Sequence, residues 1–180
     1  LAEAAVQEGA IVNLVSGPVV LAADKSINLF KINSASEMLE AVNTCMKSSD
    51  IFISCAAVAD YKPSNYSDTK IKKENLDNLE INLEKNHDIL SEVAEQFSSA
   101  YIVGFAAETS NVNSNAKKKL DSKNLNMIIS NDVSDTSIGF DSDENEVHVI
   151  TGSETIFIKK DKKIRIAREI LNIISTNINS

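Results

Sequence analysis

The sequence predicts a three-layer α/β fold with a mostly parallel sheet, helices on both faces and a β-hairpin near the carboxyl terminus. The first observation is an apolar run without polar alternation at residues 51–57, which is typical of a strand covered on both faces inside a parallel sheet. The second is the alternation of such runs with helical repeats along the chain. The third is a pair of apolar segments split by Thr151-Gly152-Ser153, which predicts the hairpin.

The first half of the chain is expected to form one helix end, three strands and one complete helix. Residues 1–8 are rich in alanine and stop at Gly9, as a helix end does. Capping-box spacing at Ser34-Ala35-Ser36-Glu37 starts a helical repeat that continues to Met46. The strands are expected at residues 10–15, 27–32 and 51–57. Strand, helix and strand in this order predict a parallel, right-handed βαβ unit, so we expect a Rossmann-like fold.

The second half is expected to continue this alternation and to end with the hairpin and a helix. Its strands are expected at residues 79–83, 101–105, 127–130, 146–150 and 154–159. Its helices are expected at residues 86–97, 114–123 and 164–178. Either Asn86 or Asp88 is placed to cap the first of these helices. In a parallel sheet the loops after residues 57, 105 and 130 would lie along one edge.

Composition excludes several classes of protein. The 180 residues predict one domain with a core of its own, and the apolar fraction of 43% and charged fraction of 24% are ordinary. A formal net charge of −8 argues against a nucleic-acid partner. There is no apolar run long enough to cross a bilayer and no signal peptide, so we expect a cytoplasmic protein without a membrane partner.

The two cysteines and the first residue carry further expectations. Cys45 and Cys55 lie in apolar patterns, which predicts reduced thiols in the core rather than a disulfide or a metal pair. The chain starts at Leu1, without a methionine and inside a helical pattern. We therefore expect residues 1–180 to be a single domain that is truncated at its amino terminus.

The stretch from residue 51 to residue 73 is the first candidate for a binding site. The apolar run ends in the small residues Ala56 and Ala57 and then in Asp60, where open parallel sheets bind ligands. Tyr61-Lys62-Pro63 is expected to stop the strand, because proline cannot donate to a ladder. Lysines then follow on a polar loop, at Lys70, Lys72 and Lys73. The pattern fits a nucleotide site, and it also fits an ordinary strand end followed by a solvated loop.

Three strings in this chain resemble a known family. Ile-Ser-Cys-Ala-Ala-Val-Ala-Asp-Tyr-Lys-Pro at residues 53–63, followed by Lys-Ile-Lys-Lys at 70–73, is similar to the signature of bacterial phosphopantothenoylcysteine synthetase. Asn-His-Asp-Ile-Leu at 86–90 resembles that family's Asn-Pro-Asp-Ile-Leu, and Val-Gly-Phe-Ala-Ala-Glu-Thr at 103–109 agrees as well. The family is the CTP-dependent ligase of coenzyme A biosynthesis, usually fused behind a flavin-dependent decarboxylase. The resemblance runs from Leu1 to about residue 170.

The resemblance implies a set of site residues. It implies CTP binding by Ser54, Cys55, Ala56, Asp60, Lys70, His87, Asp88, Ile89, Leu90, Phe105, Lys119 and Lys123. It implies substrate contacts by Ala57 and Lys72. Lys70 is the expected catalytic residue, and Asp60 is expected to accept hydrogen bonds from cytosine or ribose.

Each of these residues also has an ordinary structural interpretation. Lys119 and Lys123 lie four residues apart on one helical face, which also suits a solvated lysine face of the kind expected for Lys117 and Lys118. Phe105 can stack on a base or fill the core. The helix start near Asp88 can hold a phosphate or be a plain cap. His87, which stands where the family has proline, can meet a phosphate or be solvated.

The family's reaction implies three small-molecule substrates: CTP, 4'-phosphopantothenate and L-cysteine. The acid attacks the α-phosphate of CTP to give an acyl-cytidylate, which the amine of cysteine then opens. Mg²⁺ is expected to come with the triphosphate rather than to occupy a metal site built by the protein, and FMN only with a preceding decarboxylase domain. The family also implies a homodimer, with the hairpin at residues 146–159 as a candidate arm.

One departure from the family bears on activity. The family's glycine-rich first strand and its Asn-Arg-Ser-Ser-Gly-Lys-Met-Gly stretch would precede Leu1, and that stretch carries an asparagine implicated in handling the intermediate. We therefore expect the fragment to be able to bind nucleotide without completing the reaction. Two other functions stay open: a Rossmann-type NAD(P)-binding oxidoreductase domain, although no Gly-x-Gly-x-x-Gly turn is visible, and a non-catalytic regulatory homologue.

Overall fold

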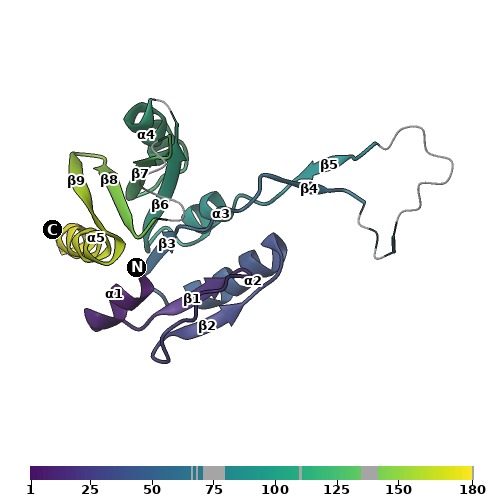
Figure 1. Cartoon of the computed structure of the whole chain (residues 1–180), viewed down its shortest axis with the longest axis horizontal. Helices are drawn as coiled ribbons and strands as arrows, with labels where there is room; N and C mark the ends of the chain where they lie inside the picture. Colours follow the sequence, from purple (N-terminus) through teal and green to yellow (C-terminus); the bar gives the residue numbers. More distant parts are fainter. Residues whose placement is uncertain (66, 68, 71–79, 110, 135–141, 180) are drawn as a thin grey trace.

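A five-stranded mixed sheet forms the main body of the chain (Figure 1). The computed structural model describes residues 1–65, 67, 69–70, 80–109, 111–134 and 142–179. The strand order is β3-β6-β7-β8-β9. The strands are β3 (Ile51–Ser54), β6 (Tyr101–Glu108), β7 (Met127–Asp132), β8 (Glu144–Thr151) and β9 (Thr155–Lys162). β3, β6 and β7 run parallel, and β8 and β9 add an antiparallel hairpin at one side, as predicted.

Helices cover both faces of this sheet and give it two apolar cores. On one face α5 (Lys163–Ile178) packs over β6 to β9, with α1 (Ala2–Gln7) beside it through a 2.8 Å hydrogen bond from Arg168 to Gln7. On the other face lie three helices: α2 (Ala35–Met46), α3 (Ile89–Gln96) and α4 (Val112–Ser122). The predicted three-layer α/β class is therefore confirmed. Among the residues that the structure describes, no helix has the length and apolar content needed to cross a membrane.

Alternation along β6 divides its side chains between the two cores. Ile102 and Ala106 belong to the core under α2, α3 and α4, whereas Val103 and Phe105 face the core under α5. Gly104 lies between them on the α3 side, and a side chain there would meet Leu90 of α3. This alternation decides which predicted site residues can meet.

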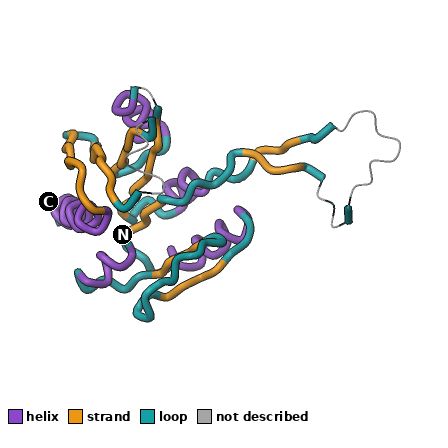
Figure 2. Tube along the Cα trace, viewed as in Figure 1, coloured by secondary structure: helices purple, strands orange, loops and turns teal. Residues whose placement is uncertain are grey.

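The β1–β2 pair is a correction to the predicted βαβ unit. β1 (Asn13–Ser16) and β2 (Asn28–Lys31) pair in parallel with each other, in a sheet separate from β3 (Figure 2). The run at 51–57 is thus not a central strand covered on both faces: β3 ends at Ser54, and Ile51 is 39% exposed. Among the described strands β3 has β6 as its one partner, and the fully covered strand is β7. An apolar run shows that a strand forms but not how many neighbours it has.

The capping box of α2 uses the predicted residues, but its second hydrogen bond goes to a different backbone N–H group. Ser34 caps the helix and accepts a 3.2 Å hydrogen bond from the backbone N–H of Glu37. The Glu37 carboxylate reaches back to the N–H of Asn33, at 2.9 Å, rather than to that of the cap residue itself. The sequence signal therefore located the helix start correctly.

A two-stranded ribbon extends from the body where the sequence predicts a strand stop. β4 (Tyr61–Pro63) pairs antiparallel with β5 (Leu83–Lys85), and both figures show the ribbon extending away from the helices. Pro63 continues the chain as a strand because β4 has a single described partner, so a free edge tolerates the missing N–H. The sequence predicted a strand at 79–83, and the structure has its strand, β5, at Leu83–Lys85 instead. Residue 79 is outside the described residues.

The hairpin predicted as a dimer arm is built into the sheet, and the prediction that the two thiols lie in the core is wrong. β8 and β9 are part of the sheet, with Val147 and Ile158 almost fully buried, so this hairpin is no projecting arm. Lysines on the outer strand β9 are typical of a protected sheet edge. Cys45 is half-buried on the flank of α2 and Cys55 is exposed past the end of β3, and both thiols are free. Beside Cys45, it is Met46 that is buried in the core.

Candidate functional site

The carboxyl ends of three parallel strands meet at one edge of the sheet. Ser54, the last residue of β3, is in register with Gly104 of β6, which in turn pairs with Ile128 of β7. The loops that follow these strands therefore lie side by side, as predicted. Asp60 and Phe105 lie at the same end of the sheet. This edge is where open parallel sheets bind ligands.

The loop after β3 is fastened to the start of α3. Asn86 donates from its backbone N–H to the carbonyl of Asp60 and from its side chain to the carbonyl of Ala59, both at 2.8 Å. Asp88 is the N-cap of α3 and accepts a 3.1 Å hydrogen bond from the N–H of Ser91. Of the two predicted cap residues, Asp88 therefore caps the helix, and Asn86 holds the loop. The N–H groups and dipole of the α3 start lie beside the loop after β3.

An ion pair joins the start of α3 to the end of α4. The ammonium group of Lys123 lies 2.6 Å from the Asp88 carboxylate. Partial burial raises the pKa of Asp88, but the hydrogen bonds from Lys123 and Ser91 together outweigh it, and the net pKa lies below its ordinary value. Asp88 is thus ionised at neutral pH, and its carboxylate forms an ion pair with Lys123.

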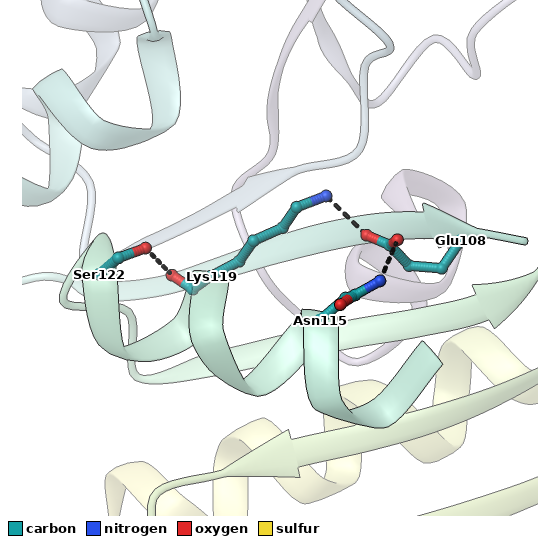
Figure 3. A network of polar contacts seen from close by, with 4 residues as sticks. All are labelled: Glu108, Asn115, Lys119 and Ser122. Carbon is teal, nitrogen blue, oxygen red and sulfur yellow. Dashed lines mark hydrogen bonds and ion pairs between the residues drawn. The ribbon is translucent and has the colours of Figure 1, made fainter. Parts of the chain in front are cut away.

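A second lysine contacts a carboxylate at the end of β6. Figure 3 shows Lys119 and Asn115 of α4 pointing at Glu108, at 2.6 Å and 3.2 Å. The hydrogen bond from Lys119 lowers the pKa of Glu108, against the opposing effect of burial, and Asn115 lowers it further. Lys119 and Lys123 therefore share a helix face, as predicted, but each is matched to its own carboxylate.

The Glu108 contact predicts a dependence of stability on pH. The folded pKa of Glu108 lies below the ordinary 4.5, so its stabilising contribution is fully present above that value and is lost as the pH falls through the folded pKa. Glu108→Gln should lower the free energy of unfolding by about 1 kcal/mol at neutral pH, and by less in acid. Urea unfolding of both proteins between about pH 3 and pH 7 measures this. A difference that stays constant with pH would contradict it.

On the opposite face of the sheet a cavity of about 400 Å³ opens beneath α5. Four of the predicted site residues line it: Cys55, Ala56, Ala57 and Phe105. Phe105 therefore lies across the sheet from Glu108, Lys119 and Asp88. The structure splits the predicted set between two faces that meet at the sheet edge.

Sequence reasoning missed three polar residues in this cavity: Asn131, Asn145 and Lys163. Asn131 follows the predicted strand at 127–130, and its place at a strand end was a usable signal. Asn145 reaches the cavity through a register shift in the hairpin, which no periodicity reveals.

The remaining predicted residues have varied surroundings. Ile89 is buried and Leu90 is half-buried, so their side chains belong to the core under α3. His87 lies 2.8 Å from Glu92 and lines a second cavity of about 480 Å³ between α2 and α3. Lys70 is exposed, and Lys72 and Lys73 lie outside the described residues. Within the described ranges no group of three or more His, Cys, Asp or Glu side chains could hold a metal ion.

A family model matches residues 1–178, nearly the whole chain, and it is described as the DNA/pantothenate metabolism flavoprotein C-terminal domain. The chain belongs to this family. The match agrees with the fold, the three strings at the sheet edge and the resemblance drawn from them. It does not support the NAD(P)-binding alternative.

Relatives of this flavoprotein C-terminal domain give the same result. The coenzyme A biosynthesis bifunctional protein CoaBC of Escherichia coli is 40% identical over 98% of this chain and 44% of that protein. That of Bacillus subtilis is 44% identical over 91% of this chain and 38% of that protein. The chain thus spans less than half the length of these curated relatives.

Solved structures share the fold. The crystal structure of a CoaBC C-terminal domain is 37% identical, with a TM-score of 0.82 over 99% of this chain and 80% of that chain. A Cab2 variant in complex with phosphopantothenate-cysteine has a TM-score of 0.67 over 85% of this chain and 53% of that chain. At 19% identity, the Cab2 likeness shows the fold alone.

Proposed function

We propose that this chain is the ligase half of a coenzyme A biosynthesis protein, which joins 4'-phosphopantothenate to L-cysteine at the expense of CTP. We base this on the Lys123–Asp88 contact at the start of α3, where a cation, a helix N-terminus and the loop after β3 lie at one sheet edge. The family membership and the CoaBC relatives support it.

The reaction proceeds in two transfers. A carboxylate oxygen of the acid bonds to the α-phosphorus of CTP as the bond from that phosphorus to the bridging oxygen breaks, and pyrophosphate leaves. The amine of cysteine then attacks the acyl carbon of the mixed anhydride, loses a proton and expels CMP. Both transfers build negative charge on oxygen atoms, so the chain must supply fixed donors and cations.

The chain's residues have distinct roles in this scheme. The N–H groups at the start of α3, with Lys119 and Lys123, bind the triphosphate, and Asp60 accepts hydrogen bonds from cytosine or ribose. Lys70 approaches on the ribbon of β4 and β5 and stabilises the charge that develops during transfer. A phosphate at Lys123 would replace the carboxylate of Asp88 as the partner of that lysine.

The proposal also covers cofactors and partners. Magnesium enters with CTP and offsets charge on the phosphate oxygens, because the described residues offer no cluster of ligands for it. FMN belongs to a fused decarboxylase, as the bifunctional relatives suggest, and not to this chain. The ligase acts as a homodimer.

The two lysines of α4 provide a direct test of the nucleotide site. Lys123→Ala and Lys119→Ala should each weaken CTP binding roughly tenfold, because each removes a charged hydrogen-bond donor from the phosphates. Titration calorimetry with CTP measures the loss. Lys118→Ala on the exposed face of the same helix is the matched control and should leave the affinity unchanged. Unchanged affinity in the first two variants would assign both lysines to the solvated surface.

A second experiment separates the ligase from a regulatory homologue. The intact protein that carries this chain should release pyrophosphate from CTP only when 4'-phosphopantothenate is present, and should bind no NADH. CTP binding without pyrophosphate release would point to a regulatory domain.

A further inference from the structure

Carboxylates of the chain itself neutralise the two lysines that are proposed to bind phosphate. Lys119 lies 2.6 Å from Glu108, as Figure 3 shows, and Lys123 lies 2.6 Å from Asp88. The pKa values of both carboxyl groups lie below their ordinary values, so both groups are ionised at neutral pH. The two ammonium groups and the two carboxylates therefore cancel in charge. A phosphate that approaches either lysine must compete with a carboxylate for it.

The paired lysines share one side of α4. Lys119 and Lys123 are four residues apart on one helix face, and each meets a carboxylate from a different element, β6 in one case and α3 in the other. The ion pairs among the described residues include neither Lys117 nor Lys118, which are exposed on the same helix. The carboxylates are thus placed at the two lysines that face the sheet edge.

Asp88 uses its two carboxylate oxygens for two separate contacts. Its Oδ1 atom accepts the 3.1 Å hydrogen bond from the N–H of Ser91 that caps α3, and its Oδ2 atom lies 2.6 Å from the ammonium group of Lys123. The cap needs only Oδ1, which asparagine would supply equally well. The negative charge of Asp88 is therefore needed for the contact with Lys123 and not for starting the helix.

These ion pairs can weaken a phosphate contact without preventing it. The side chain of Asp88 is 43% exposed and that of Lys119 is 49% exposed. Breaking an ion pair at such exposure changes an equilibrium constant by at most about fivefold. A phosphate carries more charge and more acceptor oxygens than a carboxylate, so it can displace one. Its net gain is smaller than at an unpaired lysine.

We propose that Asp88 and Glu108 are intramolecular competitors of the nucleotide phosphates, which weaken the binding of CTP and of the phosphate-bearing products. This inference rests on the proposed function and adds a regulation of the same site. The carboxylates pair with Lys123 and Lys119 in the empty protein and separate from them when phosphates bind. They pair with the lysines again as the products leave, so product release does not leave two unpaired cations.

Asp88→Asn tests the competition in the intact protein. Asparagine keeps the cap of α3 and the size of the side chain, but it has no charge with which to pair with Lys123. The dissociation constant for CTP, measured by titration calorimetry, should fall about two- to fivefold, because the phosphates no longer displace a carboxylate. A carboxylate that only orients Lys123 for the nucleotide would give the opposite sign, and a raised dissociation constant would overturn the inference for this pair.

Two controls separate the ion pair from the general effect of removing a negative charge. Glu92 also lies in the first turn of α3, but its carboxylate contacts His87, at 2.8 Å, and no lysine of α4. Glu92→Gln should therefore change the CTP dissociation constant by less than about twofold, since exposed charges act weakly at a distance. In a Lys123→Ala background, Asp88→Asn should have an equally small effect, because the competition needs that lysine. A full two- to fivefold fall in either control would overturn the inference.

Glu108→Gln repeats the test at the second ion pair. It should lower the CTP dissociation constant about two- to fivefold in the wild-type background and not in a Lys119→Ala background. A wild-type protein that binds no CTP overturns both this inference and the proposed function. A wild-type protein that binds CTP and releases pyrophosphate, together with Asp88→Asn and Glu108→Gln variants of unchanged or lower CTP affinity, overturns the inference alone.

Discussion

Replacing Lys70 by alanine is expected to lower turnover about a hundredfold while CTP affinity changes little. Lys70 is exposed and follows the β4 strand, so without substrate nothing in the described chain fixes it beside the sheet edge. Its charge should therefore act on the transition state more than on bound CTP. A fixed cation aimed at developing charge contributes roughly 3 kcal/mol, or about a hundredfold in rate.

The measurement is steady-state kinetics of the intact protein, paired with equilibrium binding of CTP. Lys62→Ala is the control, because Lys62 lies on the same ribbon and pairs with Glu84 at 3.2 Å on the surface. Its turnover should stay close to that of the wild type, since such exposed pairs contribute little. If Lys70→Ala loses binding and rate in equal proportion, Lys70 only anchors phosphate.

Replacing Gly104 by valine is expected to destabilise the fold by about 3 kcal/mol, the upper end of the usual cost of overpacking. A Cβ atom at Gly104 would lie 2.9 Å from Leu90 and 3.0 Å from Leu125, and valine adds two methyl groups beyond it. Leu90 lies in the first turn of α3, and Leu125 lies between α4 and β7. The substitution should therefore push α3 away from the sheet and weaken CTP binding as well.

Urea unfolding measures the loss of stability, and calorimetry measures the loss of CTP affinity. Gly152→Val is the matched control: it lies in the hairpin turn, and a Cβ atom there would meet nothing within 4 Å. Its free energy of unfolding should stay within about 0.5 kcal/mol of the wild type. A Gly104→Val protein of wild-type stability would show that α3 can shift without cost.

Local signals in the sequence were sufficient for most elements of the fold. The helix starts at Ser34 and Asp88 are set by contacts within a few residues, so spacing located the first and narrowed the second to Asn86 or Asp88. The hairpin of β8 and β9 follows from apolar segments and a turn, which are also local. The loops at the sheet edge could be predicted because parallel strands end together.

Contacts between distant residues were not encoded in any local pattern. The edge position of β3 depends on which strands lie beside it, and the run at 51–57 reads the same with one neighbour or two. Phe105 and Glu108 face opposite sides of the sheet because side chains alternate along β6, and Lys119 of α4 lies on the Glu108 side. Asn145 enters its cavity only because of the irregular hairpin.

The short connection between β5 and α3 has a mechanical consequence. Asn86 donates two hydrogen bonds to the loop after β3. Two residues later, Asp88 forms an ion pair with Lys123 at the end of α4. These contacts thereby connect three segments that are far apart in the chain. We therefore expect that a ligand which separates Lys123 from Asp88 also shifts Asn86, two residues away, and with it the loop at Asp60.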